Sequence, residues 1–306
     1  MIGSFFKTSY SIVYNAVLEF IDDEAITRAG ALAFFGIFSI PPILIIILNG
    51  VAFFAGQQVA NSEIFEQIRI LWGDRLASLI QGLITSYSVE FQQEESSVRT
   101  VVGLTAFLVS SSSFFLYIQY SLNRIWDVKP KPKNTVLSLI INRLFSLGII
   151  LVLVSLILMS VLLDSFLVIM NQVMNRLLAV DQITSLLFNI LGPLLSYLLV
   201  VLILAFIFKY LAAVNMKWEV AVFGSALTSL LFVIGKLLIG LMIGSANIEG
   251  TYGIVGSLIL VMLWVYYSAA ILYFGAELTQ QYGRYRSKPI QPANGAVKIT
   301  MEETSR

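Results

Sequence analysis

The chain has 306 residues, of which 58% are hydrophobic and only 12% are charged. Soluble domains average about 45–50% apolar and about 25% charged residues, so this composition excludes a soluble globular enzyme. The net charge of +1 gives no electrostatic case for nucleic-acid binding, and the absence of His and Cys excludes most metal sites, disulfides and imidazole or thiol chemistry.

The first 27 residues predict an amphipathic helix. Apolar side chains recur at helical spacing from Phe6 to Ile21, whereas Lys7 and Glu19 fall outside that set. A cleavable signal peptide does not fit, because there is no basic, apolar and then small-residue pattern. We expect the helix to lie at the cytoplasmic membrane interface or to pack on the cytoplasmic end of the bundle.

Six apolar stretches predict an all-α polytopic membrane protein. Stretches of about 18 or more residues with at most isolated charges are long enough to cross a bilayer. They lie at residues 29–54, 98–120, 137–163, 184–208, 220–243 and 254–279. The charged and apolar residues of 55–97 predict a helical extracytoplasmic cap between the first two spans.

The distribution of cations predicts the orientation. When the flanks of the six spans are assigned alternately to two sides, 14 Lys and Arg residues fall on the side of the termini and 4 on the other side. Because cytoplasmic loops carry the excess of Lys and Arg, both termini are predicted to be cytoplasmic. Residues 1–288 then form one integral membrane domain, residues 129–133 a stiff basic linker, and residues 289–306 a weakly ordered cytoplasmic tail.

Two groups of residues inside the first two spans are candidates for a substrate pathway. Pro41 and Pro42 remove backbone donors from the first span, which predicts either a packing kink or a discontinuous helix facing a cavity. In the second span, Ser110 and Ser113 share one helix face. They predict either close helix packing or the polar lining of a cavity.

Two ionisable residues complete the candidate pathway. Lys236 lies within the fifth span, where it either snorkels, pairs with Glu249, or binds an anionic group. Glu277 lies near the cytoplasmic end of the sixth span, where pairing with Arg28 or Arg124 is the alternative to a role in the pathway. In the hairpin between these spans, Gly240 and Gly244 suit close helix contact, within one chain or in a homo-oligomer.

The chain resembles the YihY/BrkB family of bacterial inner-membrane proteins. The matching stretches are Arg28 to Phe35 followed by Ser39 and Pro42, Asn123 to Trp126, Gly235-Lys236, Tyr252 to Ser257, and Leu263 to Ala269 continued by Gly275 to Leu278. The resemblance implies six helices in the inner membrane with cytoplasmic termini. The doubled Pro41-Pro42 departs from the common pattern of the family. A ribonuclease BN label attached to the family requires clustered metal ligands that include His, which this chain lacks.

These observations favour a transporter, exporter or lipid flippase of unknown substrate, with its cavity among the first, second, fifth and sixth spans. The alternative is a non-transporting structural or regulatory protein of the cell envelope. We expect no enzymatic activity, catalytic residue, metal site, cofactor or nucleic-acid partner. The expected partners are the lipid bilayer and a small solute or lipid.

Overall fold

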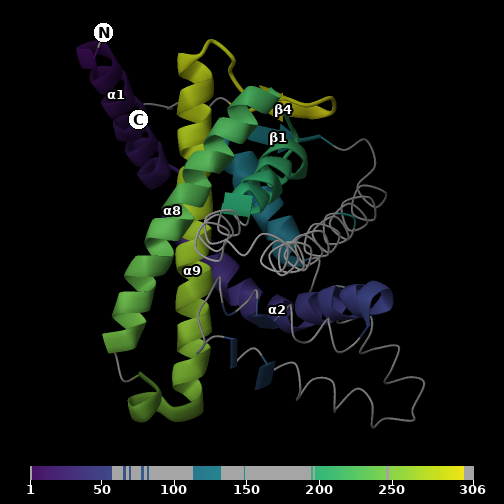
Figure 1. The fold of residues 1–306 in the computed structure, drawn as a ribbon. Helices are drawn as coiled ribbons and strands as arrows, with labels where there is room; N and C mark the ends of the chain where they lie inside the picture. Colours follow the sequence, from purple (N-terminus) through teal and green to yellow (C-terminus); the bar gives the residue numbers. More distant parts are fainter. Residues whose placement is uncertain are drawn as a thin grey trace, which may run out of the picture.

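The computed structural model describes residues 2–56, 113–131, 197–245 and 248–299, together with the isolated residues 65, 66, 69, 77, 78, 81, 82, 148, 194 and 195. This part of the chain is mostly helical (Figure 1). The third predicted span, residue 148 apart, and most of the predicted cap lie outside the described residues.

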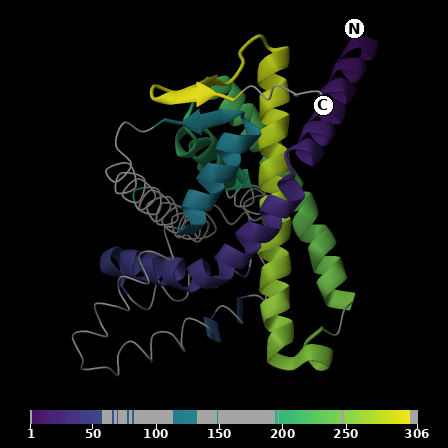
Figure 2. The same cartoon turned by 180° about the vertical axis from the view of Figure 1, so that it is seen from behind.

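Two consecutive helices form the N-terminal part. Helix α1 (Ile2–Asp22) covers the predicted amphipathic segment, and helix α2 (Ala25–Ala55) covers the first predicted span. The turn between them places Glu24 in the left-handed conformation, with φ of 51°. Helix α2 is continuous through Pro41 and Pro42, and it changes direction along its length in both views (Figures 1 and 2).

Two further segments lead from helices into short strands. Residues 113–125 are helical, and strand β1 (Val128–Pro130) follows after Asp127, whose φ is 54°. Residues 197–206 are helical and continue as the π-helix η1 (Ile207–Leu211), which leads to strand β2 (Val214–Asn215). Trp126 joins these segments to the rest of the molecule, because its indole N–H donates to the carbonyl of Ala276 at 3.2 Å and its ring packs edge-on against Phe208.

The hairpin of helices α8 (Trp218–Ser245) and α9 (Ile248–Tyr285) forms the centre of the fold (Figure 1). Its close packing comes from two Gly-x-x-x-Thr pairs, Gly224 with Thr228 and Gly275 with Thr279. The side chain of Thr279 lies against Gly224, and that of Thr228 lies against Gly275. Each threonine hydroxyl also donates to the carbonyl of the glycine one turn earlier, at 2.7 and 2.6 Å, so no hydroxyl is left unpaired at this contact.

Within the predicted weakly ordered tail, residues 291–298 form two more strands, which corrects that expectation for the part of the tail that the structure describes. Strand β3 (Gln291–Pro292) pairs antiparallel with β2, and strand β4 (Ala296–Lys298) pairs antiparallel with β1. The predicted linker is likewise part of a strand, because Val128 to Pro130 form β1. Strands of two or three residues are too short for a periodic pattern, and pairing partners far along the chain stabilise them. The end of the molecule that carries these strands is called the strand end below.

The described helices agree in part with the six predicted spans. Two segments are long and apolar enough to cross a membrane, Trp218–Gly235 and Ile259–Tyr285, and Ala25–Ser39 and Tyr197–Leu211 are shorter apolar helices. The expectation of an all-α protein becomes that of a mostly helical protein with four short strands in the described residues. The number of membrane crossings stays a prediction.

Candidate functional site

Buried polar side chains gather in the described helices at the strand end. The fully or nearly fully buried ones are Ser121, Asn123, Ser225, Thr228, Ser229, Glu277, Thr279, Gln280 and Gln281. Several buried polar atoms have no hydrogen-bond partner, which is uncommon in folded proteins. These are the hydroxyls of Ser121, Ser225, Ser229, Ser268 and Tyr273, both carboxylate oxygens of Glu277, and Nε2 of Gln281.

Glu277 is the most unusual member of this set. The residue is 0% exposed, and neither Oε1 nor Oε2 accepts a hydrogen bond. The charged residues around it are Glu19, Asp23, Asp127 and Arg284, of which three are acidic. A buried carboxylate without a partner is costly for folding, so the position calls for an explanation in function.

The polar residues of α9 form a file along one helix face. Tyr273, Glu277 and Gln281 are spaced four residues apart, and Arg284 follows three residues later, so they lie one above the other. The polar neighbour of the Tyr273 hydroxyl is Ser121 of the helix at 113–125. The file therefore runs from within the helix packing toward the end of α9.

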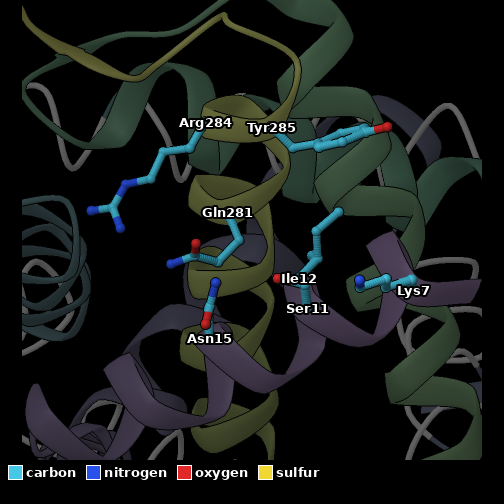
Figure 3. A pocket seen from close by; sticks show the side chains of 7 residues that line it. All are labelled: Lys7, Ser11, Ile12, Asn15, Gln281, Arg284 and Tyr285. Carbon is cyan, nitrogen blue, oxygen red and sulfur yellow. The ribbon is translucent and has the colours of Figure 1, made fainter. Parts of the chain in front are cut away.

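A cleft opens at the upper end of this file, between α1 and the end of α9 (Figure 3). Its volume is about 670 Å³. The lining residues are Lys7, Ser11, Ile12 and Asn15 from α1, and Gln281, Arg284 and Tyr285 from α9. Figure 3 shows the amide groups of Asn15 and Gln281 close together on facing helices, with Arg284 pointing away from them. Gln281 thus lies between the cleft and Glu277.

Charged residues from three segments of the chain lie near the cleft between α1 and α9, which is called the entrance below. Arg284 forms an ion pair with Glu19 of α1. Asp23 lies in the turn before α2, where burial, reinforced by the negative charge of Asp127, raises its pKa to about 6. Burial also raises the pKa of Asp127. The entrance therefore gathers carboxylates that are partly shielded from water.

The structure brings together only some of the predicted site residues. Glu277, Arg28 and Arg124 all lie at the strand end, but the expected pairing of Glu277 with an arginine does not form. Arg28 donates to the backbone carbonyl of Asp23 at 2.9 Å and stacks over Tyr120 instead, because the α1–α2 turn brings that carbonyl close. Arg124 lies near Asp23 and Asp127.

The other predicted residues lie elsewhere. Lys236 and Glu249 belong to the far parts of α8 and α9, and their side chains are outside the described set, so the proposed pairing stays a prediction. Ser110 lies outside the described residues, and Ser113 is half-buried at the start of a described helix. Pro41 and Pro42 lie in the helical backbone of α2.

Sequence reasoning did not single out Glu19, Asp23, Asp127, Tyr273 or Gln281. Their helical spacing from Glu277 would have indicated Tyr273 and Gln281, whereas Glu19, Asp23 and Asp127 come together only through the fold. In the residues that the structure describes, no group of three or more acidic side chains is arranged to hold a metal ion.

Comparison with known proteins gives matches over most of the chain. A family model described as "Virulence factor BrkB" matches residues 16–299. A protein of Stenotrophomonas maltophilia (strain R551-3) named "UPF0761 membrane protein" is 23% identical over 275 residues, which cover 89% of this chain and 61% of the relative. A protein of the same name from Cronobacter sakazakii is 27% identical over 268 residues, covering 87% of this chain and 86% of the relative.

A third protein of that name, from Alcanivorax borkumensis, is 25% identical over 270 residues, covering 86% of this chain and 58% of the relative. This chain thus spans about three fifths of the length of the relatives from Stenotrophomonas and Alcanivorax. No solved structure matches the chain.

Proposed function

The chain belongs to the virulence factor BrkB family of membrane proteins, and on that premise we propose that it is a transporter of the bacterial inner membrane, an exporter or a lipid flippase. The single observation that carries the proposal is Glu277, a fully buried carboxylate without a hydrogen-bond partner on an apolar helix long enough to cross a bilayer. Ionisable residues at such positions commonly mark the routes of substrates, ions or protons.

The proposed pathway enters at the cleft between α1 and α9. A cargo group would pass Arg284 and Gln281 before it reaches Glu277, since these residues share one face of α9. The carboxylate would bind a proton or a cationic group of the cargo, and the hydroxyls of Tyr273 and Ser121 would supply the next polar contacts. Gln281 offers an unpaired amide donor on the way.

The remaining predicted residues would form other parts of the pathway. Lys236 would attract an anionic group in the far half of the membrane, Ser110 and Ser113 would line the cavity, and Pro41 and Pro42 would gate it. By the distribution of cations, the strand end would face the cytoplasm. We propose no enzymatic activity.

The test is reconstitution of the full chain into liposomes of phosphatidylethanolamine and phosphatidylglycerol. Two probes are followed, a fluorescent phosphatidylethanolamine reduced from outside by dithionite, and a pH-sensitive dye that reports proton flux under an imposed potassium potential. We expect flux of at least one probe with the unsubstituted chain and a loss of about tenfold or more with Glu277→Gln, because the amide cannot take up a proton or balance a positive charge. Lys236→Ala should also lower the flux.

Glu219→Gln is the matched control. It removes one carboxylate at the same end of the molecule, but Glu219 is exposed and paired with Lys288, so flux should be retained. Equal flux for Glu277→Gln and the unsubstituted chain would contradict the pathway. The absence of flux for both probes with a correctly inserted protein would favour the non-transporting envelope role.

A further inference from the structure

A second cavity of about 800 Å³ lies at the strand end and shares no lining residue with the cleft beside Glu277. Its walls come from the helix at 113–125, strand β1, Ala213, and the turn that leads into β4. The lining residues are Leu116, Gln119, Tyr120, Asn123, Arg124, Val128, Lys129, Pro130, Lys131, Ala213, Asn294, Gly295, Ala296 and Ile299. Its volume is within the range of about 300–1,000 Å³ that is typical of small-molecule sites.

Paired backbone holds the cationic wall of this cavity in place. Strand β1 pairs with β4, so that Lys129 lies opposite Val297 and Pro130 opposite Ala296. The backbone N–H of Lys131 donates to the carbonyl of Gly295 at 2.8 Å. Gly295 takes a φ of 87°, which lets the turn fold back on β1. Lys129 therefore belongs to a paired strand, and Lys131 follows that strand directly with its backbone N–H bonded to the turn before β4.

The charges of the lining are all of one sign. Arg124, Lys129 and Lys131 line the cavity, and among the residues that the structure describes no acidic side chain does. Asp23 and Asp127 lie near Arg124 but are not part of the lining. Such a wall attracts an anionic group, and phosphate oxygens are strong acceptors for both guanidinium and ammonium donors.

Asn123 adds an oriented neutral donor to this wall. The residue is only 5% exposed, and its Oδ1 accepts the backbone N–H of Ala213 at 2.7 Å. This bond fixes the amide plane, and within the part of the chain that the structure describes its Nδ2 group donates to no other residue. Because Asn123 lines the cavity, its amide can donate to an oxygen of a bound ligand.

The lining also includes apolar side chains on a helix that continues into a predicted membrane span. Leu116 and Tyr120 belong to the helix that overlaps the span predicted at 98–120, and Tyr120 is 59% exposed. Apolar side chains do not help to bind a small soluble anion, whereas they can contact the acyl chains of an amphiphile. Along the helix at 113–125, Leu116 lies about two turns before Arg124, toward the predicted membrane span, so the lining combines cations with apolar side chains on the side of that span.

We propose that this cavity binds the phosphate headgroup of an anionic membrane phospholipid, with Arg124, Lys129, Lys131 and Asn123 on the phosphate and Leu116 along the first part of an acyl chain. Basic pockets beside membrane helices commonly hold such headgroups. This lipid-binding proposal does not depend on transport activity, since the residues of the cavity are separate from the proposed pathway of Glu277.

The test is native mass spectrometry of the full chain in detergent with phosphatidylglycerol or phosphatidylcholine added. We expect the chain to retain phosphatidylglycerol more strongly than phosphatidylcholine. Lys129→Gln/Lys131→Gln should weaken phosphatidylglycerol binding by roughly thirtyfold, because each of the two cations near a membrane surface contributes about 1 kcal/mol and every 1.4 kcal/mol is tenfold. Lys129→Arg/Lys131→Arg keeps both charges and should retain binding.

The matched control is Lys217→Gln/Arg286→Gln, which removes two exposed cations of the same end from outside the cavity. It should bind phosphatidylglycerol like the unsubstituted chain. Retained binding within about twofold after Lys129→Gln/Lys131→Gln would overturn the proposal. Displacement of the lipid by millimolar inorganic phosphate, with no preference between the two lipids, would assign the cavity to a soluble anion instead and would equally overturn it.

Discussion

The two halves of the α8–α9 hairpin are built from the same two helices but differ in the polarity of the side chains that they bury. At the strand end, threonines lie against glycines of the facing helix, and Ser225, Ser229 and Glu277 are buried. Toward the other end, the ring of Tyr267 lies against Gly235, and Leu230, Val233, Ile234 and Leu238 are exposed. The helices diverge in that direction in both views (Figures 1 and 2). Close contacts at glycines thus occur in both halves, whereas the buried polar side chains of the two helices gather at the strand end.

The hairpin holds its buried polar groups at the strand end. A buried polar group without a partner costs about 1–3 kcal/mol, and this cost has to be offset by packing nearby. The interlocked Gly-x-x-x-Thr pairs supply close contact within one or two turns of Glu277. These contacts hold α8 and α9 together next to the unpaired carboxylate of Glu277.

The largest expected effect comes from Gly275→Ala. The added Cβ would meet Thr228, whose atoms lie closer than real Cβ contacts allow, so the helices must separate. We expect a loss of about 1–3 kcal/mol in stability, measured as a lower Tm in detergent. Thr228→Ala combined with Gly275→Ala should recover part of that loss, since it removes two of the three close atoms.

The far half of α8 and an open glycine provide the controls for this prediction. Leu238→Ala removes an exposed side chain, and Gly148→Ala places a Cβ that meets no atom of the described residues within 4 Å. Both should change stability by no more than about 0.5–1 kcal/mol. If Leu238→Ala and Gly275→Ala lowered the Tm equally, the distinction between the two halves would be lost.

A smaller effect is expected from Asp23→Asn in the turn between α1 and α2. The pKa of Asp23 is raised to about 6 in the folded protein, above its ordinary value of 3.8. The folded state therefore holds the proton more tightly, and stability falls as pH rises from about 4 to about 6. Asp23→Asn should remove this loss and stabilise the protein above pH 6 by about 1 kcal/mol, after allowance for solvent screening.

Thermal unfolding at pH 5 and pH 8 measures this prediction. The difference in Tm between the two pH values should be smaller for Asp23→Asn than for the unsubstituted chain. Glu66→Gln serves as the control, since Glu66 is exposed. An unchanged pH dependence in Asp23→Asn would mean that the carboxyl is not shielded from water.

The smallest expected effect comes from Glu24→Gly in the turn between α1 and α2. Glu24 has φ of 51°, a conformation that glycine adopts without the steric cost of a Cβ. The substitution should raise stability by up to about 1 kcal/mol, partly offset by the greater entropy of the unfolded chain. A fall in Tm would show that the Glu24 side chain contributes more at the entrance than its backbone conformation costs.

Sequence reasoning predicted the parts of the fold that depend on local composition. The apolar runs located α2, α8 and α9, and helical spacing located α1, because amphipathic and membrane-length patterns are properties of a single segment. The spacing of Gly224 with Thr228 and Gly275 with Thr279 is equally local, and it would have indicated the close helix contact. The strands of residues 128–130 and 291–298 were missed, since their pairing joins distant segments.

The candidate site was predictable only in part for the same reason. Glu277 was evident as a carboxylate in an apolar span, but its burial and its lack of an arginine partner follow from how α1, the 113–125 helix and α9 meet. The cationic cavity needed the C-terminal strand to fold back beside Lys129. A basic linker and a tail in the sequence thus became one binding wall in the structure.

That pairing also fixes the order in which the molecule can be assembled. Strand β4 is translated after every helix of the described chain, yet its partner β1 lies before α8 and α9. Contacts of such long sequence separation form slowly and late, because a long loop has to close first. The β1–β4 pairing therefore completes the strand end only once the helices that lie between the two strands in sequence are in place.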